Sequence, residues 1–283
     1  MGVQRIVLVA VSAAVAAALA AGAGAGDLKP KPKPPLPAVT ALAPDPYASV
    51  LAQFMAFPQV VGGKDFYCGE GNGPYVAFTF DDGPGPLTQQ LLDFLKSQHV
   101  PATFFVIGRY IAGRESIVKE ESQIGVVGDH TWDHPQLPLL ESTPGAVLDE
   151  LQRGKQAIEA VTGRTVSLFR PPFGQQDATI DGIARSLGLL DVGWSVGISD
   201  GASADDMYTN LLDGRVVGGS IVLMHENDRG EIEAFERALP VLLARGIVPV
   251  TVPQLLKRDP PTGDLPSRGG QCQTHWTPPT TSP

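Results

Sequence analysis

Cysteine, positive charge and long apolar runs are all scarce in this 283-residue sequence. Lysine and arginine total 21 against 30 acidic residues, and the net charge of −9 disfavours a nucleic acid, which must be gripped through its phosphates, as the main ligand. Only the first 22 residues approach the roughly 17–25 apolar residues of a membrane-crossing helix, so a polytopic membrane protein is excluded. Hydrophobic side chains still make up 43% of the chain, which is typical of a globular protein.

The one long apolar run, Ile6 to Gly22, follows Arg5 and leads into small residues over 21–25. A basic start, an apolar centre and A-x-A cleavage choices are typical of a secretory signal peptide, which we assign to residues 1–26. The alternative is an uncleaved membrane anchor, because the run is long and rich in alanine. Both interpretations predict a protein that is secreted or associated with the cell wall, and the first leaves no stable membrane span after cleavage.

Proline is concentrated at the two ends of the chain. Of the 26 prolines, 13 lie in residues 27–46 and 259–283. Such segments cannot bury a core, and the first should be an extended spacer. We therefore expect a Pro/Lys-rich linker over 27–48, one folded domain over 49–258, and a proline-rich tail from 259 onward.

The chain has two cysteines, Cys68 and Cys272. In an oxidising compartment an even number favours a disulfide, which here would tie the two ends of the domain together. Two free thiols remain the alternative, because a separation of 204 residues has no local geometric signature. Their spacing does not support metal binding.

Between the two ends, short apolar runs alternate with segments of helical period. The runs predict strands at 75–80, 102–107, 124–128, 166–169, 189–195, 220–225 and 247–252. The helical spacing predicts helices at 87–98, 116–122, 144–161, 179–187, 204–212 and 232–244. Strands separated by helices need right-handed crossovers and build a parallel sheet. The alternation alone leaves open whether that sheet is doubly wound or closed as a barrel.

Polar residues interrupt this pattern at the carboxyl ends of the predicted strands. They are Asp81, Asp82, His130, His134, Arg170, Asp200 and His225. In a barrel of parallel strands this is the catalytic rim. Charged groups at the ends of buried strands are costly unless they pair or coordinate something, so their convergence predicts a functional site.

Two of these histidines, His130 and His134, stand four residues apart. Pro135 biases His134 away from a helical backbone, so we expect a loop on which both imidazoles can bind one metal ion. A carboxylate from Asp81 or Asp82 would complete a set of two imidazoles and one carboxylate with open positions. Catalytic zinc and non-haem iron use this arrangement.

Asp81 and Asp82 are neighbours in the sequence, so their side chains should point apart and do different work. One can bind the metal while the other takes a proton. For this segment alone, a surface Asp-Asp-Gly-Pro turn is the alternative.

Four short motifs follow one another along the chain: Thr-Phe-Asp-Asp-Gly-Pro at 79–84, His-Thr-Trp-Asp-His at 130–134, Arg-Pro-Pro-Phe-Gly at 170–174 and Leu-Met-His at 223–225. With these motifs in this order, residues 72 to 256 resemble the NodB-type polysaccharide deacetylases of carbohydrate esterase family 4. The resemblance implies a distorted (β/α)7 barrel with parallel strands.

The resemblance also implies a role for each motif residue. It makes Asp82, His130 and His134 the metal ligands. It makes Asp81 the general base that activates water, and Arg170 the residue that holds and tunes this base.

For the other half of the reaction, the resemblance points to residues later in the chain. The backbone N–H of Phe173 would stabilise the oxyanion, and Leu223 would line the pocket for the acetyl methyl group. His225 would be the general acid that protonates the leaving amine, and Asp200 the acid that sets the charge of this histidine.

One segment departs from the family pattern. Gly197 and Gly201 stand where an acid and a tryptophan are usual. The lost tryptophan removes one wall of the substrate groove, which puts the substrate in doubt more than the reaction.

Other enzyme classes fit less well. A non-haem iron oxygenase would show an all-β pattern, which the alternation of strands and helices contradicts. A glycosidase needs two separated carboxylates on opposite sides of a sugar bond, and the adjacent pair here does not supply them.

We therefore predict a secreted, metal-dependent deacetylase, acting as a monomer on the N-acetylglucosamine units of peptidoglycan or a chitin-like oligosaccharide. The metal is most simply Zn²⁺, with Co²⁺, Ni²⁺ and Mn²⁺ as alternatives. An O-deacetylase of acetylxylan and a non-catalytic carbohydrate-binding relative are the alternative functions.

Overall fold

The computed structural model describes residues 33–35, 41–55, 67–143, 145–199, 203–261, 272 and 274–277. The expected signal peptide, residues 1–26, lies outside the described residues, as do Asp200, Gly201 and most of the proline-rich tail. Residues 36–283 form one compact unit, to which the fold below belongs. None of the helices in the described part is long and apolar enough to cross a membrane.

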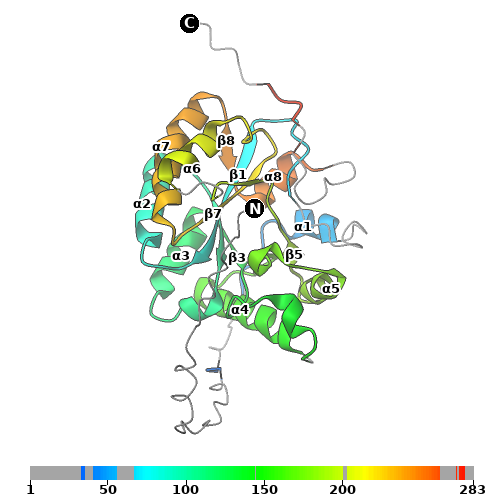
Figure 1. The fold of residues 1–283 in the computed structure, drawn as a ribbon. Helices are drawn as coiled ribbons and strands as arrows, with labels where there is room; N and C mark the ends of the chain where they lie inside the picture. The colour runs from blue at the N-terminus through cyan, green and yellow to red at the C-terminus, as the bar shows by residue number, and fades with distance from the viewer. Residues whose placement is uncertain are drawn as a thin grey trace, which may run out of the picture. The chain divides into compact units, whose positions relative to one another are not determined.

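A sheet of eight strands forms the centre of this unit (Figure 1). The strands are β1 (Tyr75–Gly83), β2 (Thr103–Val106), β3 (Val126–Asp129), β4 (Leu168–Phe169), β5 (Leu190–Asp191), β6 (Val196–Gly197), β7 (Ile221–His225) and β8 (Val248–Val250). Their hydrogen-bonded order is β5-β4-β3-β2-β1-β7-β6, and β8 pairs with the beginning of β1. Every pair of these strands is parallel. The expected parallel α/β architecture is confirmed, in the form of a curled, distorted barrel.

Helices connect the strands. They are α1 (Ala48–Met55), α2 (Thr88–Gln98), α3 (Glu115–Ile124), α4 (Ala146–Thr162), α5 (Ala178–Ser186), α6 (Ala204–Leu212), α7 (Arg229–Ala244) and α8 (Val252–Arg258), with short 3-10 turns η2 (Gly108–Tyr110), η3 (Leu137–Leu140) and η4 (Pro172–Gly174). Asp177, Ser203 and Asp228 cap α5, α6 and α7 by accepting backbone N–H groups. The cap at Asp228 makes α7 begin earlier than the apolar spacing predicts, because a cap uses polar residues that carry no hydrophobic period.

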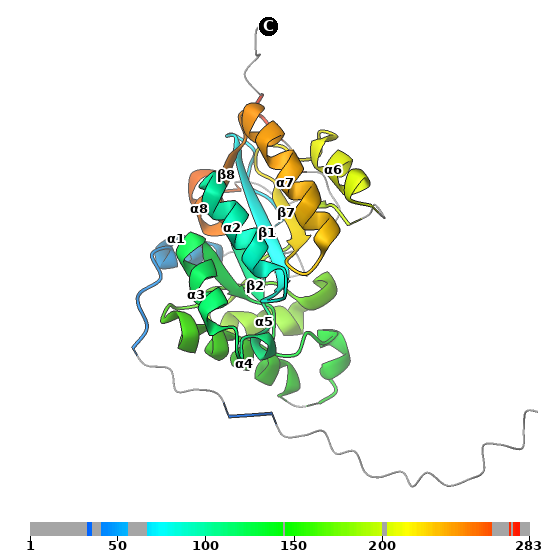
Figure 2. The ribbon, with the colours of Figure 1, turned by 90° about the vertical axis from the view of Figure 1, so that its left-hand side faces the viewer.

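The core between the sheet and the outer helices is built on aromatic contacts. Phe235 of α7 lies 5.1 Å from Phe78 and 5.4 Å from Phe80 of β1, measured between ring centroids. The ring of Phe94 in α2 contacts Phe235 at 5.9 Å. Figure 2 shows α2 and α7 beside each other over β1 and β7. This packing holds β1 rigidly, and β1 carries the two adjacent aspartates.

The strand expected at 189–195 is wrong in its extent. Only Leu190–Asp191 of this segment forms a strand, β5, and the chain then reaches β6 (Val196–Gly197) at the opposite end of the strand order. The N–H of Val192 donates to Phe169 O at 2.8 Å, whereas the N–H of Ser195 donates to Ile221 O at 2.9 Å. The chain therefore crosses from one edge of the sheet to the other between these two residues. Apolar periodicity reports local preference and does not report which neighbour a strand pairs with.

The Arg170 side chain holds the segment that crosses between β5 and β6. It is 0% exposed, and it donates from Nε to Val192 O at 3.0 Å and from Nη2 to Gly193 O at 2.8 Å. Its guanidinium carbon lies 4.2 Å from the centroid of the Phe105 ring. Hydrogen bonds and this aromatic contact offset the cost of burying the charge. A residue expected at the rim thus also anchors the segment between β5 and β6.

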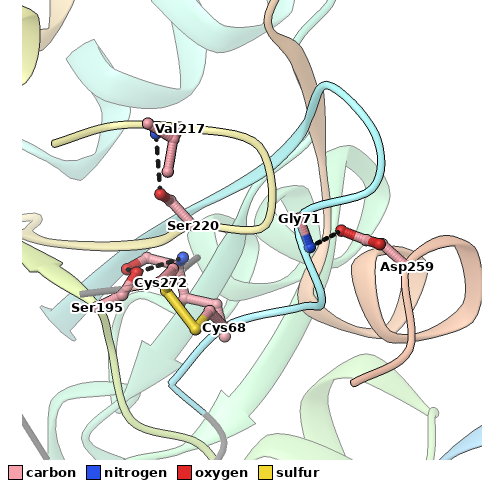
Figure 3. The surroundings of a disulfide bond; sticks show 8 residues. Cys68, Gly71, Ser195, Val217, Ser220, Asp259 and Cys272 are labelled. Carbon is pink, nitrogen blue, oxygen red and sulfur yellow. Dashed lines mark hydrogen bonds between the residues drawn. A yellow bond between two sulfur atoms is a disulfide. The ribbon is translucent and has the colours of Figure 1, made fainter. Parts of the chain in front are cut away.

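A disulfide joins Cys68 to Cys272, as the even number of cysteines predicts (Figure 3). Cys68 is buried and forms an isolated bridge with Ser220, which precedes β7. Nearby, Asp259 accepts the N–H of Gly71 at 2.8 Å. These contacts fasten the chain on both sides of the domain at the amino ends of β1 and β7, away from the carboxyl ends where the site residues lie.

Candidate metal centre and active site

The loops at the carboxyl ends of the strands adopt strained backbone conformations. Asp82, Thr131, His134 and Phe173 have φ values between 58° and 68°, in the left-handed region that non-glycine residues rarely enter. Such conformations persist where the surroundings over-determine them, and they cluster at functional sites. All four lie at or beside the predicted ligand positions.

Asp82, His130 and His134 come together, as the sequence predicts. Oδ1 of Asp82 lies 3.3 Å from Nε2 of His134 and 3.5 Å from Nε2 of His130. One ligand atom from each residue lies within 4.8 Å of the others. The Asp82 oxygen is buried and accepts no hydrogen bond, so it is suited to a cation. A carboxylate and two imidazoles are the donor set of a catalytic divalent-metal site.

The charge states of these groups also suit a metal. Burial tends to raise the pKa of Asp82, but its interactions with the nearby imidazoles of His130 and His134 bring it below its ordinary value. Burial, followed by the charge of His130, lowers the pKa of His134. Asp82 is thus anionic and His134 neutral near pH 7, which are the forms that bind a cation.

The orientation of His130 is set by a carbonyl group. Its Nδ1 lies 2.7 Å from the backbone oxygen of Arg170. A carbonyl only accepts, so Nδ1 carries the proton and the Nε2 lone pair faces Asp82 and His134. The loop itself is held by Thr131, whose hydroxyl accepts the His134 N–H at 3.0 Å.

Asp81 has surroundings quite different from those of Asp82. It is 3% exposed, and Oδ1 accepts a hydrogen bond from Nη1 of Arg170 at 2.8 Å. The same Nη1 donates to Oγ1 of Thr79 at 2.7 Å. Oδ2 of Asp81 lies 3.8 Å from Nε2 of His130 and so faces the three candidate ligands. The expected pairing of Arg170 with Asp81 is therefore present.

His225 lies directly across from Asp81, because β1 and β7 pair in the register Asp81 to His225. Nδ1 of His225 lies 3.1 Å from both carboxylate oxygens of Glu231, which also accepts the His225 backbone N–H. Burial tends to lower the pKa of His225, but the hydrogen bond and charge of Glu231, with the charges of Asp81 and Asp82, raise it to about 9. His225 is therefore a proton donor at neutral pH.

The two residues expected to contact substrate lie beside these groups. Phe173 in η4 is 55% exposed, and its ring centroid is 4.7 Å from that of His134. Leu223 is 8% exposed and pairs with Thr79 in the β1–β7 register, two residues before the Asp81–His225 pair.

The sequence analysis missed two polar residues that follow β7. Glu231, in the first turn of α7, provides the carboxylate beside His225, whereas the expected Asp200 lies outside the described residues. The sequence feature that could have identified Glu231 is an acidic residue in the first turn of a helix, three positions after the capping Asp228. Asn227 donates from Nδ2 to the backbone oxygen of Asp82 at 2.7 Å and fixes the turn that carries this ligand.

Known proteins share this fold and sequence pattern. A family model for polysaccharide deacetylases matches residues 69–192. A bifunctional xylanase/xylan deacetylase of Cellvibrio japonicus is 31% identical over 191 residues, which make up 67% of this chain but only 28% of that enzyme. A peptidoglycan-N-acetylglucosamine deacetylase of Bacillus cereus is 32% identical over 198 residues, or 66% of this chain and 71% of that protein.

The fold is also similar to a crystal structure from Bacillus anthracis that is described as a pseudoenzyme of carbohydrate esterase family 4. The two structures have a TM-score of 0.62 and are 28% identical, and the match covers 70% of each chain. The fold is thus shared by proteins with and without catalytic activity, so function has to be argued from the site residues.

Proposed function

Since this chain belongs to the polysaccharide deacetylase family, carbohydrate esterase family 4, we propose that it is a metal-dependent hydrolase of N-acetyl groups. Its substrate is a polysaccharide that contains N-acetylglucosamine, either peptidoglycan or a chitin-like oligosaccharide. The protein acts as a monomer outside the cytoplasm, secreted or bound to the cell wall.

Asp82, His130 and His134 hold the metal, most simply Zn²⁺. Co²⁺, Ni²⁺ and Mn²⁺ suit the same donors. When bound, a divalent cation supplies Lewis acidity toward the acetyl carbonyl and lowers the pKa of a water molecule. The fit rests on the buried Asp82 oxygen that accepts no hydrogen bond and on the two Nε2 atoms at 3.3 and 3.5 Å from it.

Asp81 acts as the general base. Its Oδ2 faces the metal ligands, while Arg170 holds Oδ1. The hydrogen bond from Arg170 fixes the position of the carboxylate and so aims Oδ2. Asp81 accepts one proton from water as the oxygen attacks the acetyl carbon.

His225 acts as the general acid. It donates one proton to the amide nitrogen as the C–N bond breaks, so that the products are acetate and a free amine. Glu231 keeps His225 charged before this step. The backbone N–H of Phe173 stabilises the developing oxyanion, and Leu223 packs against the acetyl methyl group.

The observation that carries the proposal is the register of β1 against β7. It places the candidate base, Asp81, directly beside the candidate acid, His225, with the three candidate ligands next to the base. Amide hydrolysis needs a proton removed from water and a proton given to nitrogen, and a carboxylate next to an imidazole supports assigning these two transfers to Asp81 and His225.

Acetate release tests the function. The full chain, loaded with Zn²⁺, is incubated with chitin oligosaccharides, peptidoglycan glycan strands and acetylated xylan, with and without a chelator. We expect release from the N-acetylated glycans that stops on chelation and returns with metal. Metal-dependent release from xylan alone would favour the O-deacetylase alternative, which the similarity to the Cellvibrio enzyme supports.

The second candidate function is carbohydrate binding without turnover. Gly197, together with the similarity to a pseudoenzyme, supports it. It predicts glycan binding with no metal-dependent acetate release from any substrate. The filled base and acid positions favour the enzyme.

A further inference from the structure

A cavity of about 200 Å³ opens beside the candidate metal centre. Its walls are Asp82, Ile107, Arg109, Tyr110, Asp133, His134 and Asn227. Two of these residues are candidate metal ligands, so anything bound in the cavity lies directly beside the reacting acetyl group. We call it the Arg109 pocket.

The backbone of η2 fixes this pocket to the metal-ligand loop. The N–H of Gly108 donates to Thr131 O at 2.9 Å, and the N–H of Arg109 donates to Trp132 O at 3.1 Å. A Cβ atom on Gly108 would come within 2.8 Å of the Trp132 ring and 3.0 Å of Gly154, so only glycine allows this close approach. The backbone of Arg109 is therefore fixed relative to the loop that carries the candidate metal ligands.

Arg109 is the one arginine or lysine in the lining, which also contains the carboxylates of Asp82 and Asp133. Nη2 contacts the Tyr110 hydroxyl at 3.1 Å, and Nη1 lies 3.4 Å from Oδ1 of Asp133. These contacts use two of the five N–H donors of a guanidinium. The side chain is 45% exposed, and a long, solvated ion pair of this kind contributes little stability. A carboxylate arriving from solvent can thus form a two-point contact with Arg109 at small cost.

Two rings flank the site in a way that suits a chain of sugars. The exposed Phe173 ring lies against His134, and the guanidinium carbon of Arg109 lies 4.9 Å from the centroid of the Tyr110 ring. Aromatic faces pack against the apolar faces of sugar rings, and Asn227 adds an amide that can bond to hydroxyl groups. A glycan crossing the metal centre would therefore place one unit at the acetyl site and a neighbouring unit at the Arg109 pocket.

We infer that the Arg109 pocket is a subsite for a sugar unit that bears a carboxylate, next to the unit that loses its acetyl group. The inference rests on the proposed function and narrows its substrate to an acidic glycan. The protein carries a net charge of −9, so an anionic polymer needs a local cation at the site to bind. Such a carboxylate can belong to a lactyl ether group on the sugar or to a uronic acid.

Binding to matched glycans tests the inference without turnover. The full chain with Asp81→Asn is titrated calorimetrically with peptidoglycan strands freed of peptide, which carry lactyl carboxylates, and with the same strands after amidation. Glucuronoxylan, with its uronic acids intact or reduced, tests the second source. We expect tighter binding to the carboxylated member of at least one pair, and the pair that differs identifies the source.

Comparing Arg109→Gln with Arg237→Gln distinguishes a specific effect of Arg109 from the effect of losing one positive charge anywhere on the protein. In the Asp81→Asn background, Arg109→Gln should weaken binding of the carboxylated glycan about tenfold and change binding of its neutral partner less than about twofold. Arg109→Lys should be intermediate, because it keeps the charge but loses the two-point contact. Arg237→Gln removes the same charge from α7, where Arg237 pairs with Asp205 and does not line the Arg109 pocket, and should change neither affinity.

Equal losses on carboxylated and neutral glycans, or no loss with Arg109→Gln, would overturn the subsite. Circular dichroism and thermal unfolding confirm that each variant is folded. Acetate release by the wild-type chain is scored separately. A wild type that prefers the carboxylated strands but releases no acetate would refute the proposed function while leaving the subsite standing.

Discussion

Two adjacent aspartates acquire different chemistry here because their surroundings differ. Asp81 is enclosed and paired with Arg170, whereas Asp82 has a left-handed backbone and points its oxygen at two imidazoles. A strand with regular alternation would turn these side chains to opposite faces. The irregular end of β1, where the pairing register shifts between Asp81 and Gly83, instead brings both to one site.

Replacing Asp81 distinguishes the role of general base, proposed for Asp81, from the role of metal ligand, proposed for Asp82. Asp81→Asn should lower kcat by about 10²–10⁴-fold, because the amide cannot accept the proton from water. Its metal content, measured by elemental analysis, should equal that of the wild type. His130→Ala should lose both metal and activity. Full activity in Asp81→Asn would show that another group is the base.

The partner of His225 predicts a pH dependence. As general acid, His225 must be protonated, and Glu231 holds its pKa at about 9. Glu231→Gln removes the negative charge, so the alkaline fall in kcat should move to lower pH by about 1–3 units. The measurement is acetate release from pH 5 to 10.

The His225–Glu231 pair also makes the stability of the folded protein depend on pH. The pKa of His225 is raised from 6.5 in the unfolded chain to about 9 in the folded one. The stabilisation that comes from protonated His225 beside Glu231 is fully present below about pH 6.5 and is lost as the pH rises through about 9. Thermal unfolding at pH 6 should therefore distinguish the wild type from Glu231→Gln more than unfolding at pH 10. An equal difference at both pH values would exclude a charged His225.

At the scale of elements, α4 holds the loop that carries the two histidines. The N–H of Trp132 donates to Glu150 O at 3.1 Å, and the N–H of Asp133 donates to Oε2 of the same glutamate at 2.8 Å. A Cβ atom on Gly154 would lie 2.1 Å from Oδ1 of Asp129 and 2.8 Å from the carbonyl carbon of Thr131. The helix can approach this closely only because Gly154 has no side chain.

Two glycine substitutions in helices should therefore have opposite effects. Gly154→Ala should destabilise the protein by about 1–3 kcal/mol and lower activity, because the added methyl displaces the histidine loop. Gly182→Ala in α5, where nothing lies within 4 Å, should stabilise it by about 0.5–1 kcal/mol. Urea unfolding measures both. A neutral Gly154→Ala would show that α4 can move without disturbing the loop.

At the scale of the whole molecule, the disulfide closes a loop of 204 residues around the barrel. Such a link stabilises mainly by restricting the unfolded chain, by about 2–5 kcal/mol. The double variant Cys68→Ser/Cys272→Ser should unfold at lower temperature than the oxidised wild type. Its acetate release at 25 °C should be unchanged, since the bond lies at the amino ends of the strands. A parallel loss of activity while the protein stays folded would mean that the disulfide also shapes the site.

Much of the fold could be predicted from the sequence because its signals are local. Alternating apolar periods mark the strands and helices, and polar residues mark the strand ends. The expected strand at 189–195 failed because partner choice is a long-range property. The adjacent residues Asp191 and Val192 belong to one edge of the sheet, and Ser195 belongs to the other.

By itself, the sequence determined the motif residues, their order and the donor types that a metal centre needs, since each is written in a few consecutive residues. Only the tertiary structure decided which residues meet. It placed Glu231 beside His225, gave Arg170 contacts with both Asp81 and the segment between β5 and β6, and set Arg109 next to the candidate metal ligands. The physical reason is that hydrogen bonds and ion pairs act over a few ångströms in space, and distance along the chain does not determine that separation.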